Sequence, residues 1–250
     1  MDAVSFQGAP YPVRGTVTVL ESRMAARTAL MSSSELFAGL SRSDLQLIAS
    51  ASRLRDYAPD EFLFEQGEPV RNILLIESGC VKLTQLSSGG SEVILWLHGP
   101  GDAVGVLNIP AQYSHTCSAR AIVKCRVVIW DWMKLDALPA NSQVRKNISR
   151  IVSSRIGELE ERFREIATEK VSRRVACALV RILKQVGRPA PAGVEIFLSR
   201  EEIAQLTGTT VFTISRLISK WSEQGLLLPR REAVLILDPV RLLQIGTEDE

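Results

Sequence analysis

Hydroxyl-bearing and basic side chains recur at helical spacing between residues 209 and 220. Arg216 carries paired N–H donors that can reach O6 and N7 of a guanine, and such a contact discriminates between bases by about 1–3 kcal/mol. Neighbouring hydroxyls and a lysine can bond base edges or phosphate oxygens. The pattern is therefore typical of a surface that reads duplex DNA. Its candidate contact residues are Thr209, Thr210, Val211, Phe212, Thr213, Ser215, Arg216 and Lys220.

A helix-turn-helix would hold these side chains on one surface. Ser199 followed three residues later by Glu202 is a capping box, so one helix should begin there, and residues 207–209 should end it. A second helix should run from about Thr210 to Gln224 and stop at Gly225. Apolar residues fall on one face of this second helix and polar residues on the other. An ordinary pair of packed helices is the alternative on this pattern alone.

Two short apolar runs follow the second helix, at residues 226–228 and 233–237. They predict a hairpin, and a hairpin directly after such a helix makes a winged helix. Arg230 and Arg231 lie at its tip, where they are placed for phosphate contact. A solvated charged turn is the competing interpretation of these two arginines.

Charge supports a nucleic-acid partner only locally. The chain of 250 residues has a net charge of +2. Between residues 168 and 247, twelve lysines and arginines stand against seven acidic residues, and the acidic tail at 248–250 hides this excess. A local basic excess is the electrostatic footprint of a DNA-binding domain.

Several function classes are disfavoured by what the sequence lacks. GxSxG, HExxH and P-loop motifs are absent, so an enzyme is not expected. There is no apolar run of about 18 residues and no signal-peptide core near Met1, which indicates a cytoplasmic protein without a membrane partner. The four cysteines show no CxxC spacing, so reduced core thiols and no metal site are expected.

The rest of the chain predicts an α+β fold. Residues 1–31 lack a clear period and are expected to form a flexible leader. Residues 32–138 begin with two short helices and continue as short apolar runs separated by glycine turns, which predicts an antiparallel β-barrel or jelly roll. A small barrel can enclose one ligand, so this part is interpreted as a sensor domain.

A long helix should follow at residues 139–167. Apolar side chains recur there at steps of three or four. The stripe is longer than one small barrel can cover, so a parallel dimer seam is favoured over an intramolecular packing helix. A hinge near residues 167–170 would lead to a C-terminal DNA-binding domain at 168–250. The predicted seam residues are Val144, Ile148, Val152, Ile156, Leu159 and Phe163.

The order of these parts resembles the bacterial CRP/FNR transcription regulators over roughly residues 36–243. The helix-turn-helix carries most of the likeness, because Ser215 and Arg216 match the Glu-x-x-Ser-Arg core of the FNR branch's recognition helix. Phe212 stands at the glutamate position and cannot hydrogen-bond, so the family's usual contact there is lost. Its ring could touch a thymine methyl or fold back against the wing. The resemblance also rests on Glu169-Lys170-Val171 and Arg174-Val175-Ala176.

The resemblance implies a homodimeric regulator with a cyclic-nucleotide-binding-like barrel. Two recognition helices would enter successive major grooves of an inverted repeat, about 34 Å apart. Duplex DNA, a second copy of the chain and RNA polymerase are the implied partners. Ser199 and Arg200 match positions that touch the DNA backbone in the family, and a helix N-terminus beside a cation suits a phosphate oxygen. A ligand-binding module that acts on other proteins, without DNA, is the alternative from another class.

In family members that bind cyclic nucleotides, a Gly-Glu-Leu turn holds the ribose and an Arg-Ser/Thr-Ala segment binds the cyclic phosphate. Here a valine replaces the carboxylate, and a histidine, mostly neutral at pH 7, replaces the permanent cation. Cyclic AMP in the usual mode is therefore not expected, and the effector is left unassigned. The corresponding residues are Gly105, Val106, Leu107, His115, Thr116 and Cys117.

Other sensing chemistry depends on the cysteines and histidines of the barrel. An iron–sulfur cluster needs about four grouped thiolates, and no cysteine precedes Cys80. Haem would need an axial ligand such as His98, His115, Cys80 or Cys117. A thiol switch could use Cys117 and Cys125, although strand neighbours of this kind are more often buried and inert.

Overall fold

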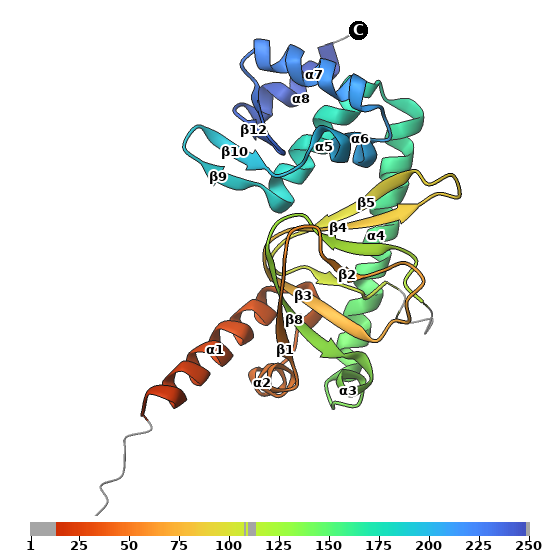
Figure 1. The fold of residues 1–250 in the computed structure, drawn as a ribbon. Helices are drawn as coiled ribbons and strands as arrows, with labels where there is room; N and C mark the ends of the chain where they lie inside the picture. Colours follow the sequence, from red (N-terminus) through yellow and green to blue (C-terminus); the bar gives the residue numbers. More distant parts are fainter. Residues whose placement is uncertain (1–13, 108, 110–113, 249–250) are drawn as a thin grey trace, which may run out of the picture.

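A computed structural model describes residues 14–107, 109 and 114–248. A barrel lies between an N-terminal helical segment and a C-terminal helical domain, and one long helix runs beside both the barrel and the C-terminal domain (Figure 1). The predicted α+β architecture, with an antiparallel barrel, a long helix and a winged helix-turn-helix, is confirmed.

The N-terminal segment is helical where a flexible leader is predicted. Met31 is fully buried in a core that also contains residues of the barrel and of the long helix. The leader prediction is therefore wrong for residues 24–31, because apolar contacts that leave no local period in the sequence anchor this part of the helix. Residues 1–13 lie outside the described part. The elements here are α1 (Arg14–Ser33), η1 (Glu35–Phe37) and α2 (Arg42–Ser50).

The barrel consists of two four-stranded antiparallel sheets, with the strand orders β1-β8-β3-β6 and β2-β7-β4-β5. Side chains from both sheets fill the space between them, and Ile76, Val81 and Val127 are fully buried there. This is the jelly roll that the glycine-punctuated runs predict. The strands are β1 (Arg53–Tyr57), β2 (Phe62–Phe64), β3 (Asn72–Ser78), β4 (Val81–Leu86), β5 (Glu92–His98), β6 (Ala103–Val104), β7 (Ser118–Ala121) and β8 (Cys125–Asp131).

The long helix α4 (Asn141–Thr168) follows the short α3 (Trp132–Asp136) and divides its apolar stripe between two environments. Val144 and Ile148 are buried in the chain's own core, so the prediction that they lie in a dimer seam is wrong. The physical reason is that η1 packs on this end of α4, where Asn147 donates to the Leu36 carbonyl at 2.9 Å.

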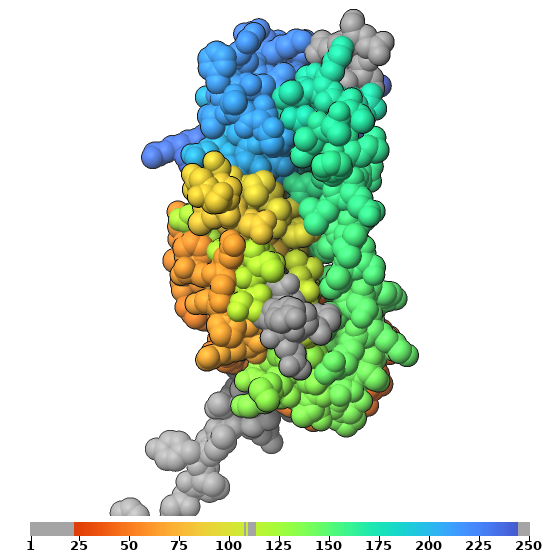
Figure 2. All heavy atoms as spheres, turned by 90° about the vertical axis from the view of Figure 1, so that its right-hand side faces the viewer, coloured from red at the N-terminus to blue at the C-terminus, as the bar shows by residue number. Residues whose placement is uncertain are grey.

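The second half of the α4 stripe is uncovered. Ile156 is 54% exposed and Phe163 is 75% exposed, and Leu159 between them is also exposed. Figure 2 shows α4, in green, at the surface of the molecule beside the barrel. Val152, one turn earlier, packs partly against the chain's own core. A seam with a second chain can therefore use only the half of the stripe from residue 156 onward.

The C-terminal domain combines helices with a four-stranded antiparallel sheet of order β11-β12-β10-β9. The wing β11–β12 appears where the sequence predicts it, and β10 extends it by pairing with β12. β9, β10 and α8 have no counterpart in the sequence-based expectation. The elements are α5 (Val171–Val186), β9 (Arg188–Ala190), β10 (Gly193–Ile196), α6 (Arg200–Thr207), α7 (Val211–Glu223), β11 (Leu227–Arg230), β12 (Ala233–Ile236) and α8 (Pro239–Glu248).

The barrel and the C-terminal domain are joined by buried contacts. β5 contributes apolar side chains to the hydrophobic core of the C-terminal domain. Lys82 of β4 donates to Glu202 of α6 at 2.7 Å, and the side chains of this ion pair are only 7% and 16% exposed. Arg162 of α4 donates to the carbonyl of Leu206 at 3.2 Å and also to a β5 carbonyl. The barrel therefore holds the start of α6, and the long helix holds its end.

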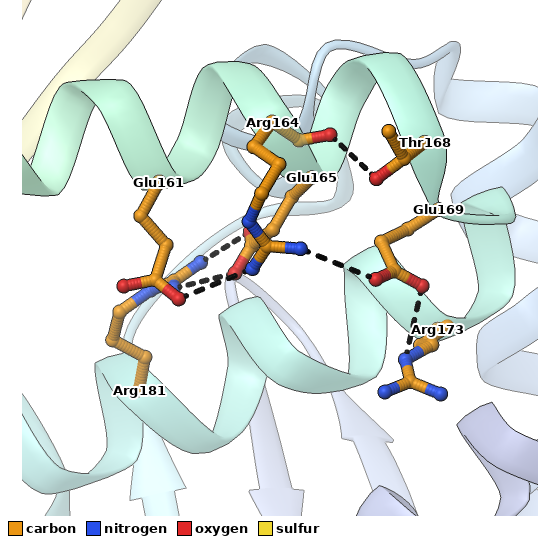
Figure 3. Close-up of polar contacts among 7 residues, drawn as sticks. All are labelled: Glu161, Arg164, Glu165, Thr168, Glu169, Arg173 and Arg181. Atoms are coloured by element: carbon orange, nitrogen blue, oxygen red, sulfur yellow. Dashed lines mark hydrogen bonds and ion pairs between the residues drawn. The ribbon is translucent and has the colours of Figure 1, made fainter.

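A second set of ion pairs fixes α5 against α4 (Figure 3). Arg181 on α5 donates through both terminal nitrogens to the two carboxylate oxygens of Glu165 on α4, each at 2.9 Å. Just beyond the end of α4, the Glu169 carboxylate lies 3.6 Å from Arg164 and 3.1 Å from Arg173. Because a bidentate pair restricts direction as well as distance, the C-terminal domain has a defined orientation on the long helix.

Replacing Lys82 with methionine should destabilise the protein most at neutral pH. Burial alone would raise the pKa of Glu202, but hydrogen bonds from Lys82 and Ser199 outweigh it and hold that pKa below its ordinary 4.5. A lowered pKa means that the carboxylate stabilises the fold above about pH 4.5 and loses this contribution as it protonates at lower pH. We expect the variant to lose about 3 kcal/mol of unfolding free energy at pH 7, and less at about pH 3.5.

Urea unfolding at the two pH values measures this difference. The matched control is Arg126→Met, because Arg126 and its partner Asp56 form an exposed ion pair on the barrel, with side chains 50% and 47% exposed. The control should change the unfolding free energy by less than about 1 kcal/mol. A Lys82 variant as stable as the parent at pH 7 would contradict the structural importance of the pair.

Candidate nucleic-acid interface and ligand pocket

The first helix of the helix-turn-helix, α6, is capped as the sequence predicts. Ser199 Oγ accepts from the Glu202 N–H at 3.1 Å, and Glu202 accepts from the Ser199 N–H at 2.9 Å. Gly208, in the left-handed conformation with φ of 61°, ends the helix. Arg174 of α5 donates to the Thr207 carbonyl at 2.9 Å and is buried. This arginine fixes the turn between the two helices, a role that the sequence analysis did not assign to it.

The second helix, α7, presents the predicted contact residues outward. Thr210 is its N-cap and accepts from the Thr213 N–H at 3.1 Å. Ile214, Ile218 and Trp221 anchor the opposite face in the domain core. All eight candidate residues lie on the turn or on α7. Those that are exposed are Thr210, Val211, Phe212, Arg216 and Lys220, and those that are half-buried are Thr209, Thr213 and Ser215.

Phe212 and Arg216 form a pair one helical turn apart. The Phe212 side chain is 72% exposed, so the interpretation that it folds back against the wing is wrong. The Arg216 guanidinium lies 5.8 Å from the centre of the Phe212 ring, within cation–π range. The ring therefore points outward and lies beside the guanidinium that is expected to read a guanine.

The wing and the start of α6 line one groove. Ser199, Arg200, Arg230 and Arg231 all border this space of about 420 Å³. Arg230 also donates to Glu195 of β10 at 2.9 Å, which ties it to the sheet, whereas Arg231 lies at the exposed tip. The four residues predicted to contact the DNA backbone are thus brought together, at a helix N-terminus that favours anions.

The six residues predicted for the effector pocket are brought together only in part: Gly105 lies beside His115, whose Cε1 atom is 3.7 Å from the position of a Cβ on Gly105. Val106 and Cys117 are buried in different cores, and Thr116 is exposed. Leu107 is half-buried against the barrel core. Gly105 has a φ of +85°. A Cβ placed on this residue would lie 3.0 Å from the Asn72 carbonyl oxygen, so a side chain there would be crowded. Residues 108 and 110–113 lie outside the described part.

His115 lines a pocket that the sequence analysis did not identify. This pocket, the barrel-mouth pocket, has a volume of about 350 Å³. The His115 ring is 6% exposed and stacks on Phe64, with the ring centres 3.7 Å apart and the planes 12° apart. Burial lowers the pKa of His115 below its ordinary value, so the ring is neutral at pH 7. The residues that characterise the pocket are Arg53, Arg55, Tyr57, Phe64, Arg71 and His115.

The barrel cysteines are protonated thiols. Burial raises the pKa of Cys80 to about 12 and that of Cys117 to about 11. Burial also raises the pKa of Cys125. A thiol switch needs thiolate character at neutral pH, so these environments oppose that alternative. Among the described residues, no three potential metal-ligating side chains are grouped. His98 is buried, with its Nδ1 atom 3.6 Å from the Asp102 carboxylate.

None of the helices in the described part of the chain combines the length and the apolar character needed to cross a membrane. The fold and the outward face of α7 together define a regulator in which a sensor-like barrel is joined to a winged helix-turn-helix. Comparison with known proteins identifies its family. Residues 54–142 match the cyclic nucleotide-binding domain, and residues 173–245 match the Crp-like helix-turn-helix domain.

Curated relatives and solved structures agree with these two family matches. The chain is 29% identical over 197 residues to the transcriptional activator protein Anr of Pseudomonas protegens, covering 78% of this chain and 80% of that protein. It is 26% identical over 210 residues to a CRP-like cAMP-activated global transcriptional regulator of Mycobacterium tuberculosis, covering 83% and 94%. The structure of FixK2 from Bradyrhizobium japonicum matches with a TM-score of 0.66 and 25% identity, covering 77% of this chain and 96% of that one. The chain belongs to the CRP/FNR family of transcription regulators.

Proposed function

We propose that this DNA-binding regulator acts as a homodimer that reads an inverted repeat. The observation that carries the proposal is the outward face of α7, where Arg216 stands exposed beside Phe212 and Thr213. The groove at the start of α6 supplies cations for the flanking phosphates. Two copies of this surface would enter successive major grooves about 34 Å apart.

The exposed half of the α4 stripe supports pairing of two chains. Large apolar side chains that recur at helical spacing on an uncovered face are costly to leave in water, and a second copy of the helix covers them by symmetry. The dimer would place the two α7 helices for the repeat. RNA polymerase is a further proposed partner, which the similarity to a transcriptional activator supports.

Cyclic AMP bound in the family's usual mode is not part of the proposal. Val106 is buried and offers no acceptor for a ribose hydroxyl. His115 is neutral and buried, and so it supplies no permanent charge for a cyclic phosphate. The effector of the barrel is therefore left unassigned.

Selection from a random pool of duplex DNA by the purified protein, with no ligand added, tests the proposal. We expect enrichment of an inverted repeat whose half-sites are centred about one or more helical turns apart. Binding to the enriched site should weaken steeply as salt concentration rises, because phosphate contacts release counterions. Enrichment of a single unrepeated site, or no enrichment by folded dimeric protein, would contradict a dimer that reads the repeat without an effector.

A further inference from the structure

The barrel-mouth pocket lies where the two sheets of the barrel part. Tyr57, Phe64, Leu74 and Ile129 belong to the barrel core and also line the pocket. Its volume of about 350 Å³ falls within the range of small-ligand sites, roughly 300–1,000 Å³. The pocket therefore opens directly onto the apolar core of the sensor domain.

Arginines line the pocket from two strands. Arg53 and Arg55 alternate with Tyr57 on one face of β1, and the register with β8 places Arg53 opposite the core residue Ile129. Arg71, just before β3, is the third arginine of the lining. Within the described part of the chain, neither Arg53 nor Arg71 forms an ion pair. Two guanidinium groups are thus available to an anion at the entrance.

The third arginine and the nearby acid have local partners. Arg55 pairs with Glu61 at 2.7 Å, and its guanidinium lies 4.4 Å from the centre of the Tyr57 ring. Glu68, the acidic residue of the lining, accepts from the Glu65 N–H at 3.1 Å. Three arginines against one carboxylate leave the lining positive.

The pocket walls are aromatic. The stacked rings of Phe64 and His115 form one wall, and Tyr57 is almost fully buried. Burial raises the pKa of Tyr57, so its hydroxyl stays protonated at neutral pH. Flat apolar groups pack well against such rings, whereas guanidinium forks match the paired oxygens of a carboxylate or phosphate.

We propose that the barrel-mouth pocket binds a small organic anion, one that carries a carboxylate or a phosphate on a flat apolar body. The arginines 53 and 71 hold the anionic group, and the walls of Tyr57, Phe64 and His115 pack against the body. Residues 105–107 and 115–117 match the family's nucleotide contacts. Of these, only His115 lines the barrel-mouth pocket. It goes beyond the proposed function, because binding here requires no DNA.

Isothermal titration of the full-length protein tests the site with four probes. Benzoate and phenyl phosphate carry both features, and the one that binds more tightly identifies the anionic group. Benzyl alcohol lacks the charge, and inorganic phosphate lacks the body. We expect one of the two complete probes to bind at least about tenfold more tightly than both incomplete ones.

Variants assign the binding to the pocket. Replacing Arg53 and Arg71 together with alanine should weaken the better probe about tenfold or more. The matched control is Arg126→Ala, because Arg126 lies on the same barrel, is half exposed and pairs with Asp56 outside the pocket. The control should bind as the parent does. Circular dichroism establishes that both variants are folded.

Three results would overturn the proposal. Neither complete probe binds at about 10 mM; inorganic phosphate binds as tightly as phenyl phosphate; or the double variant binds as the parent does. The last result would mean that the arginines only keep the edge strand β1 from pairing with other strands. None of these readouts involves DNA, so such a failure is distinct from a failure of the DNA-binding proposal.

Discussion

Replacing Arg216 with alanine should give a protein that still binds duplex DNA but no longer prefers its own sites. A bidentate arginine–guanine contact contributes about 1–3 kcal/mol of discrimination in each half-site, and each 1.4 kcal/mol is a factor of about ten in affinity. Arg216 is exposed on α7 and lies beside the Phe212 ring, so its loss removes a base contact without disturbing the buried face. Salt-sensitive non-specific binding should remain, because the phosphate contacts are intact.

The measurement is the affinity of the parent and of the variant for two duplexes. One is the selected site, and the other is the same site with the guanine assigned to Arg216 replaced by another base. Arg200→Ala is the matched control, because Arg200 lies in the groove at the start of α6 and is assigned to phosphate. It should weaken binding to both duplexes alike and reduce the salt dependence by about one ion per half-site. An Arg216 variant that still distinguishes the two duplexes as the parent does would show that another residue reads the base.

The proximity of Phe212 to Arg216 affects which bases this interface is expected to prefer. A phenylalanine cannot accept a hydrogen bond, but its exposed ring can contact a thymine methyl. The ring also lies within cation–π range of the guanidinium beside it. We therefore expect the two side chains to contact neighbouring base pairs, and selection to enrich a half-site in which thymine stands next to the recognised guanine.

Local features of the DNA-binding domain follow from the sequence because they depend on neighbours in the chain. The capping box of Ser199 and Glu202, the left-handed Gly208 and the N-cap Thr210 are all decided within four residues. The role of Arg174 is different. Its contact with Thr207 spans 33 residues, and no local pattern distinguishes an arginine that holds a turn from one that faces solvent.

The barrel-mouth pocket likewise depends on contacts between residues far apart in the chain, here between strands. Arg53 and Arg55 alternate with Tyr57, which indicates that they share a face of a strand. Whether that face points into the barrel depends on pairing with β8, more than 70 residues later in the chain. A shift of one residue in register would turn both arginines outward. The sequence therefore could not place them in a pocket.

The α4 stripe illustrates how periodicity finds a buried face but not its partner. Val144 and Phe163 belong to one helical pattern, yet the first is buried by its own chain and the second is 75% exposed. The difference arises from η1 and the N-terminal helices, which cover only the first half of α4. Because a second chain can pack against the uncovered half, the test of the dimer should change residues there.

Replacing Ile156 and Phe163 together with glutamate should convert the dimer to monomers. Burial of each large apolar side chain contributes about 1.5–3 kcal/mol to the free energy of dimerisation. In a two-fold seam each substitution occurs twice, once in each chain. Four carboxylates placed face to face add repulsion and desolvation. We expect the dissociation constant of the dimer to rise by at least about 100-fold, as measured by sedimentation over a range of concentrations.

Ser154→Glu is the matched control, since Ser154 is exposed on α4 but lies off the apolar stripe. The control should remain dimeric. The monomeric double variant should also bind the inverted repeat far more weakly than the parent while binding a single half-site as the parent does, because each α7 surface is unchanged. A double variant that stays dimeric would move the seam away from α4, and the exposed stripe would then require a different partner.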